Sequence, residues 1–213
     1  MKKITKLAGI LILALSVNSG YSALTIVGSS QNSYNFAMSS GAVLSDGGIF
    51  TIGYYSSSLS SSYFSGLTTA SSFETGWTSL ASSASNTYGY QGLRSASIEL
   101  ATGVNTHEGK TLTMLVGNAG TISGSSQVGV FSNSAWIIPA NPTGITPGDL
   151  GADIFDSGTV AYFGSLSLGT GAYAGEGVVN SANLGVVIPE PTSASLLAIG
   201  VAGLVALRVR RKS

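Results

Sequence analysis

Short apolar runs in which side chains alternate with a period of two residues constrain the fold of this chain most strongly. Residues 49–55, 111–116 and 159–166 are rich in β-branched or aromatic side chains and are bounded by Gly, Asn, Asp or Ser. Such runs are typical of β-strands. Further runs of this kind occupy residues 24–27, 95–100, 127–131 and 135–138. About seven to nine short strands without a helical period predict an all-β fold, as a single β-sandwich or jelly-roll-like domain. We expect each sheet to bury one face and to present Ser and Thr on the other.

Four segments lack this alternation. Residues 56–65 are nearly all serine, and residues 139–158 combine three prolines with three acids, so both are predicted to be long loops. Residues 73–81 are predicted to hold a helical turn. Residues 169–188 are predicted to be either a last strand or a linker.

Charged residues make up only 8% of the chain, against about 25% in an ordinary soluble domain, and they are segregated by sign. Residues 23–188 contain two cations, Arg94 and Lys110, and eight acids, which gives a net charge of −6. Because an acidic region repels phosphate backbones, this composition argues against nucleic-acid binding. The absence of cysteine excludes disulfides and thiolate metal sites.

The N-terminal residues 1–22 have the features of a secretory signal peptide. Three lysines precede an apolar run at residues 7–17, and small residues precede a cleavage point before Ala23. The apolar run is shorter than the ~20 residues that a membrane span requires. We therefore expect export, removal of residues 1–22, and a single extracytoplasmic domain over residues 23–188.

The C-terminal residues 189–213 divide into three parts. The first part consists of Pro189, Glu190 and Pro191, and its two prolines keep this stretch out of regular secondary structure. Residues 192–207 are uncharged and apolar, and as a helix they are about 24 Å long, which predicts one transmembrane helix in a thinned bilayer. The basic tail that follows consists of Arg208, Arg210, Arg211 and Lys212. The positive-inside rule keeps this tail in the cytoplasm, so the domain is expected outside, anchored to the inner membrane.

This order of motif, apolar helix and basic tail resembles the PEP-CTERM sorting signal. Proteins with that signal are exported by Gram-negative bacteria that make exopolysaccharide, and an exosortase, an integral-membrane cysteine protease, recognises and processes it. By this resemblance, Pro189, Glu190 and Pro191 are the recognition residues and form the substrate of another enzyme. The resemblance implies an exosortase-type protease as partner, association with exopolysaccharide, and delivery to the cell surface or medium after processing.

Three aspartates, Asp149, Asp153 and Asp156, are the nearest approach to a metal site. Carboxylates on a flexible loop suit calcium, which takes six to eight oxygen ligands. Their spacing does not match an EF-hand loop, and a solvated acidic loop is the alternative. No other cofactor is expected.

Catalytic residues are scarce. The sole histidine, His107, lies in the polar run 105–110, which is predicted to be a turn between strands, and the chain has no G-x-S-x-G motif. Among the aromatic residues, Tyr63 and Phe64 are the best candidates for an exposed pair that stacks on sugars. We therefore expect a protein that is not an enzyme.

The sequence thus predicts an exported cell-surface or extracellular-matrix structural protein that is processed at a C-terminal sorting signal. Two alternatives remain. One is a carbohydrate-binding β-sandwich module, with calcium at residues 149–156. The other is a secreted polysaccharide hydrolase that uses the acids of the same loop.

Overall fold

The computed structural model describes residues 24–29, 34–85, 91–100, 106–140, 149–173 and 177–187. In chain order its elements are β1 (Leu24–Ser29), β2 (Tyr34–Ala37), β3 (Phe50–Tyr55), α1 (Ser61–Ser65), the 3-10 helix η1 (Ala70–Glu74), β4 (Trp77–Ser83), β5 (Ser95–Leu100), β6 (Thr111–Gly117), β7 (Gln127–Ile137), β8 (Asp149–Asp153), β9 (Val160–Phe163), β10 (Ser165–Tyr173), β11 (Gly177–Asn183) and β12 (Gly185–Val186). The predicted all-β class is confirmed.

Both predicted terminal segments lie outside the described residues. These are the signal peptide at 1–22 and the C-terminal segment that holds the 189–191 motif, the 192–207 apolar stretch and the basic tail. Within the described ranges, no helix has the length and apolar character needed to cross a membrane.

A six-stranded sheet forms the middle layer of the molecule. Its strands follow the order β12-β7-β6-β3-β4, and β9 pairs with β7. The pairs within this sheet are antiparallel, with Ile52 of β3 opposite Met114 of β6 and Leu115 of β6 opposite Val130 of β7. The runs predicted at 127–131 and 135–138 are one continuous strand, β7. The run at 159–166 is two strands, because Gly164 has a positive φ of 95° and breaks it.

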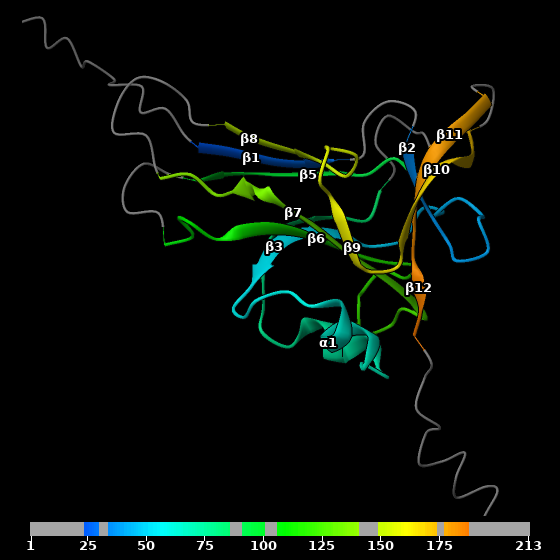
Figure 1. Ribbon diagram of the computed structural model, residues 1–213, viewed down its shortest axis with the longest axis horizontal. Coiled ribbons are helices and arrows are strands. Elements are labelled where there is room, and N and C mark those ends of the chain that lie inside the picture. Colours follow the sequence, from blue (N-terminus) through cyan, green and yellow to red (C-terminus); the bar gives the residue numbers. More distant parts are fainter. Residues whose placement is uncertain are drawn as a thin grey trace, which may run out of the picture.

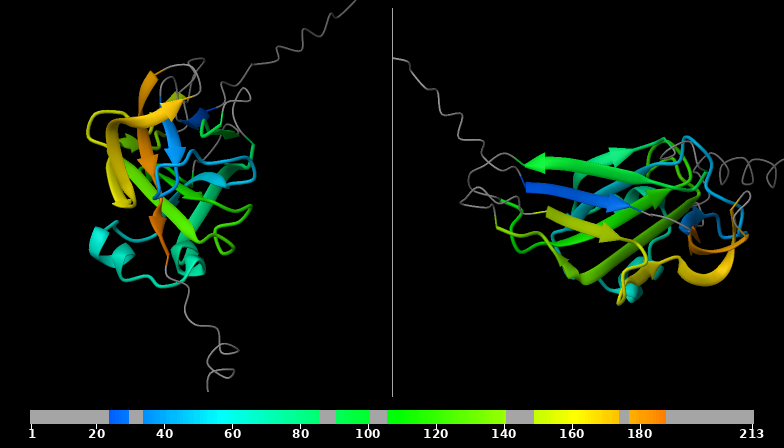
Figure 2. Two further views of the ribbon diagram at one scale, coloured as in Figure 1. Left: turned by 90° about the vertical axis from the view of Figure 1, so that its right-hand side faces the viewer. Right: turned by 90° about the horizontal axis from the view of Figure 1, so that it is seen from above.

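One face of this sheet packs against a three-stranded sheet with the order β5-β1-β8, which lies above it in Figure 1 and is seen from outside in Figure 2. The first core lies between the two layers. It combines Ile26 of β1 and Ala152 of β8 with Ile52 and Met114 of the central sheet. At Gly28 of β1 the layers are so close that a Cβ would collide with the Ile52 side chain, so any larger residue here would force Ile52 or the strand to shift.

The segment that holds α1 and η1 covers the opposite face of the central sheet (Figure 1). Here Phe64 and Phe73 form a second core with Leu115 and Val130. The loop predicted over 56–65 is confirmed for residues 56–60 and wrong for residues 61–65, which form α1. The Ser60 hydroxyl caps this helix by accepting a hydrogen bond from the Tyr63 amide at 3.3 Å. The exposed aromatic pair is wrong as well: Tyr63 is 44% exposed, but Phe64 is 1% exposed.

Hydroxyl side chains are buried within the central sheet instead of facing solvent. Thr113 donates a hydrogen bond to the Ser132 hydroxyl at 3.3 Å, and Ser132 donates to the Leu112 carbonyl at 2.6 Å. Thr51 likewise donates to the Ala81 carbonyl at 3.0 Å. The expectation of a solvent-facing Ser/Thr surface is wrong for β3 and β6, because α1 and η1 cover that face and the hydroxyls find partners inside.

The chain after Gly164 remains part of the domain. Strands β10 and β11 form a third sheet with β2, in the order β10-β11-β2. Ala182 and Leu184 are buried in the first core. Of the two predictions for residues 169–188, a last strand or a linker, the described part therefore supports strands. The β11–β2 and β1–β8 pairs are parallel, unlike the antiparallel strands of a jelly roll.

Two further local predictions are wrong in part. The helical turn predicted over 73–81 is limited to the end of η1, because residues 77–83 form β4 along one edge of the central sheet. The loop predicted over 139–158 contains β8, which pairs in parallel with β1.

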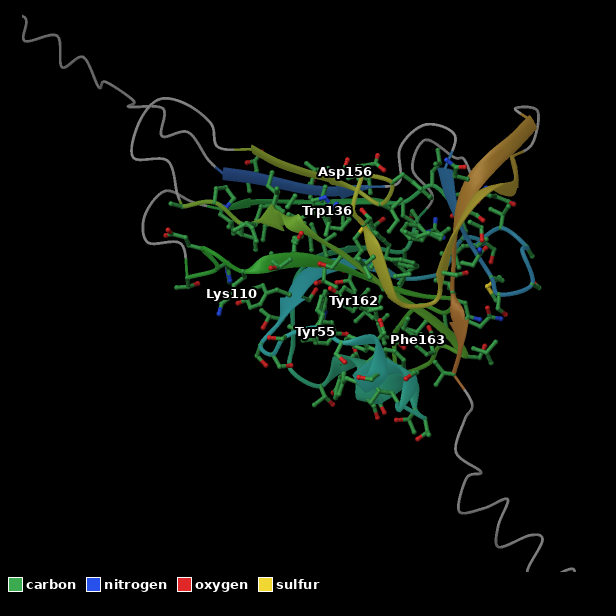
Figure 3. The ribbon with its side chains drawn as sticks, viewed as in Figure 1. Tyr55, Lys110, Trp136, Asp156, Tyr162 and Phe163 are labelled. Carbon is green, nitrogen blue, oxygen red and sulfur yellow. The ribbon has the colours of Figure 1, made fainter. Side chains whose placement is uncertain are left out.

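The turn after β8 joins the two main layers, because β8 belongs to the three-stranded sheet and β9 to the central one. Asp156 in this turn accepts a hydrogen bond from the indole nitrogen of Trp136 at 2.7 Å, and a second from the Asp153 amide at 3.1 Å (Figure 3). Trp136 belongs to β7 and is 2% exposed. One carboxylate therefore holds the turn against the central sheet.

We predict that Asp156→Ala lowers the free energy of unfolding by about 1–3 kcal/mol, because a buried indole N–H loses its acceptor. Asp156→Asn retains an acceptor oxygen and is expected to lose less. Urea unfolding of the full chain, followed by tryptophan fluorescence, measures both. Glu99→Ala, at an exposed position of β5, is the control and should change stability by less than about 0.5 kcal/mol. Equal stabilities of the Asp156→Ala and Glu99→Ala variants would contradict the role given to Asp156.

Candidate binding groove and sorting segment

A polar groove of about 430 Å³ lies on the side of the central sheet that α1 covers. Its walls come from residues 55–59, from the start of β6, from β7 and from β9. Hydroxyl groups dominate the lining, with Ser56, Ser57, Ser58, Thr111, Thr113, Ser132 and Ser134. The lining includes no carboxylate.

Two tyrosines form the aromatic part of the groove (Figure 3). The Tyr55 hydroxyl donates to the Phe73 carbonyl at 2.6 Å, and burial raises the pKa of Tyr55, with Tyr63 and Glu74 acting in the same direction. Tyr162 is half-buried, and its ring meets Phe64 edge-on with centroids 6.4 Å apart. Packing thus fixes both rings before any ligand arrives.

Lys110 supplies the one charge among the residues that line the groove. The other cation of residues 23–188, Arg94, is fully buried, where it donates to the Ser45 carbonyl at 2.6 Å and lies 3.9 Å from Asp46. Burial lowers the pKa of Arg94, and Asp46 opposes that shift. Lys110 is exposed, so it is the cation of this region that a ligand in solution reaches.

The turn that presents Lys110 is held to the end of β7 by backbone hydrogen bonds. The Gly109 amide donates to the Ile138 carbonyl at 2.9 Å, and the Ile138 amide donates to the Lys110 carbonyl at 2.9 Å. Residues 106–109 form a turn, as predicted for the polar run around His107. The His107 ring shares a hydrogen bond of 3.0 Å with the Tyr54 hydroxyl through Nδ1.

The predicted aspartates do not share one flexible loop. Asp149 begins β8 and Asp153 ends it, so an extended strand separates their Cα atoms by about 13 Å. Asp153 accepts a hydrogen bond from the Phe155 amide at 3.0 Å, and Asp156 binds Trp136. Among the described residues, no three His, Cys, Asp or Glu residues are placed to hold a metal ion. The side chain of Asp149 lies outside the description, and the calcium site stays a prediction.

A second hollow, of about 670 Å³, lies between residues 39–41 and the β9–β10 turn. Its lining includes Phe163 and Asn183 but no charged residue. The Asn183 amide donates to the Ser167 hydroxyl at 2.9 Å and the Ser181 hydroxyl donates to Asn183 at 3.2 Å, so these polar groups bind one another.

The described chain ends inside the second core. Strand β12 pairs with β7, and the Val187 amide donates to the Ser126 carbonyl at 2.9 Å. Val187 is 2% exposed. In the sequence, Pro189 follows only two residues later, so the predicted recognition residues come directly after the packed end of the domain.

Sequence reasoning did not identify the groove. The sequence offers one signal for the groove: Lys110 is one of only two cations in an acidic region. The tyrosines and serines around it come from segments far apart in the sequence, and only the strand register brings them together.

Comparison with protein families gives a match of residues 187–212 to the PEP-CTERM protein-sorting motif. Comparison with curated proteins and with solved structures yields no match. The matched residues include Pro189, Glu190, Pro191 and the basic tail, on which the resemblance rested. The motif is a recognised substrate signal for exosortase, a membrane protease, and it indicates a secreted protein that is sorted at its C-terminus. The chain therefore carries the PEP-CTERM protein-sorting motif at residues 187–212.

Proposed function

We propose that this protein is a non-catalytic component of the cell surface or extracellular matrix, and that an exosortase frees it from its membrane anchor at residues 189–191. One observation carries the proposal: the sorting motif begins at Val187, the last described residue of a packed β domain. Cleavage after that point removes none of the core residues that the structure describes. The domain is thus expected to reach the surface with both of its described cores intact.

The arrangement of the acids supports a non-catalytic role. A glycoside hydrolase needs two carboxyl groups that face one substrate. Asp153 and Asp156, two of the three acids that the hydrolase alternative would draw on, accept hydrogen bonds from backbone amides and from Trp136. These bonds assign them to the turn between β8 and β9.

The carbohydrate-binding alternative gains support from a different observation. The groove around Lys110 combines hydroxyls, tyrosine rings and one cation, which is the kind of surface that recognises a polar ligand with an apolar ring face. A surface protein with such a groove would attach to the polysaccharide around the cell.

Processing is tested at Glu190. In a host with an exosortase, we expect the surface-extracted protein to end near residues 189–191 and to lack the tail from Arg208 to Ser213. Glu190→Ala should accumulate a longer, membrane-bound form with normal export, because the one charge of residues 189–191 is lost while the signal peptide is unchanged. Intact-mass measurement of both proteins reads out the result.

Glu99→Ala, which removes an acid outside the motif, is the matched control and should be processed like the wild type. A wild-type mass that still includes residues 208–213 would show that the segment is a permanent anchor and would refute processing at this motif.

Anchoring is tested by truncation in a host without exosortase. We expect full-length protein in the membrane fraction and release of a chain that lacks residues 192–213 into the periplasm or medium. The reason is that residues 192–207 are the longest uncharged apolar run left after signal cleavage. Fractionation and immunoblotting measure the distribution. Retention of all the truncated protein in the membrane would contradict the anchor.

A further inference from the structure

We propose that the groove around Lys110 binds an anionic saccharide, with the Lys110 ammonium on the acidic group of the sugar, the Tyr162 ring against its apolar face and the serine hydroxyls on its hydroxyl groups. This proposal names a ligand class for the carbohydrate-binding alternative. It rests on the proposed surface location, because the domain meets such a polymer only after export.

The charge distribution selects an anionic ligand. Residues 23–188 carry a net charge of −6, so the domain as a whole repels polyanions. Within it, the exposed cation lies at a groove whose lining contains no acid. Glu108 is exposed in the same turn but does not line the groove. The local attraction therefore suits one isolated anionic group and disfavours a dense line of phosphates.

The remaining lining selects a sugar among anionic ligands. Hydroxyl side chains both donate and accept hydrogen bonds, as sugar hydroxyls do. Ser56, Ser57 and Ser134 are exposed along the groove, and the Tyr162 ring offers an apolar face. The volume of about 430 Å³ lies within the usual range for small-ligand sites.

The floor of the groove is ordered without a ligand. Thr113 and Ser132 are buried and linked to each other and to the Leu112 carbonyl. The hydroxyl of Tyr55 is fixed on Phe73, and Tyr162 packs against Phe64. A preformed site loses little conformational entropy when a ligand binds.

The second hollow lacks this combination. It is larger, at about 670 Å³, but no charged side chain lines it, and Ser167, Ser181 and Asn183 bind one another. It offers nothing that selects an acidic sugar over a neutral one.

The test is calorimetric titration of the full chain, purified in detergent, with four probes: oligogalacturonate, a sulfated glucan oligomer, a neutral glucan oligomer and a single-stranded DNA oligomer. We expect at least one of the two anionic saccharides to bind. Comparison of oligogalacturonate with the sulfated glucan shows whether the groove prefers a carboxylate or a sulfate. Binding should weaken at higher salt, because Lys110 is exposed and its charge is screened.

Variants locate the site. Lys110→Gln should weaken binding about tenfold or more, since a charged hydrogen bond is lost, and Lys110→Arg should retain it. Tyr162→Leu keeps an apolar contact with Phe64 but removes the ring, and should weaken binding about 2- to 10-fold. Glu108→Gln is the matched control in the same turn and should not weaken binding. Melting temperatures confirm that each variant is folded.

Three results would overturn the proposal: no binding of either anionic saccharide, equal binding by wild type and Lys110→Gln, or equal binding of the neutral glucan or the DNA. None of these bears on the proposed surface function, because the mass of the processed protein tests that separately.

Discussion

Phe50 and Ile52 of β3 belong to the first core, and Tyr55 of the same strand belongs to the second, where its ring meets Phe64 of α1. This burial of both faces of the central sheet is the constraint on which the other layers depend. Each large apolar side chain that is fully buried contributes about 1.5–3 kcal/mol, and β3, β6 and β7 supply such residues to both cores. The α1–η1 segment, with few polar anchors of its own, is held by Phe64 and Phe73. The groove exists because that segment lies against the sheet.

The sequence allowed some strands to be predicted closely, because their alternation is local. The run at 95–100 coincides with β5, and the run at 111–116 lacks only the last residue of β6. Strand β8 was missed because its pairing with β1 joins residues more than 100 positions apart, inside a stretch rich in proline and acids. Helix α1 was missed because serine favours loops, whereas the burial of Phe64 and the Ser60 cap determine its structure.

The two candidate sites differ in the same way. The sorting motif is contiguous, so its prolines, its glutamate and its basic tail could be recognised in order. The groove assembles Tyr55, Lys110 and Tyr162 from three parts of the chain, and no local pattern reports that they meet. The bond between Asp156 and Trp136, twenty residues earlier, could not be foreseen, because it is invisible without the strand register.

These features describe a domain that is packed up to the residue where its sorting motif begins. Val187, the last described residue, is buried in the second core, and the match to the sorting motif begins at the same residue. Limited proteolysis of the full chain with mass analysis tests this boundary most directly. The account predicts that the smallest stable fragment retains residues 177–187, because Ala182, Leu184 and Val187 are buried. A stable folded fragment that ends before residue 177 would contradict it.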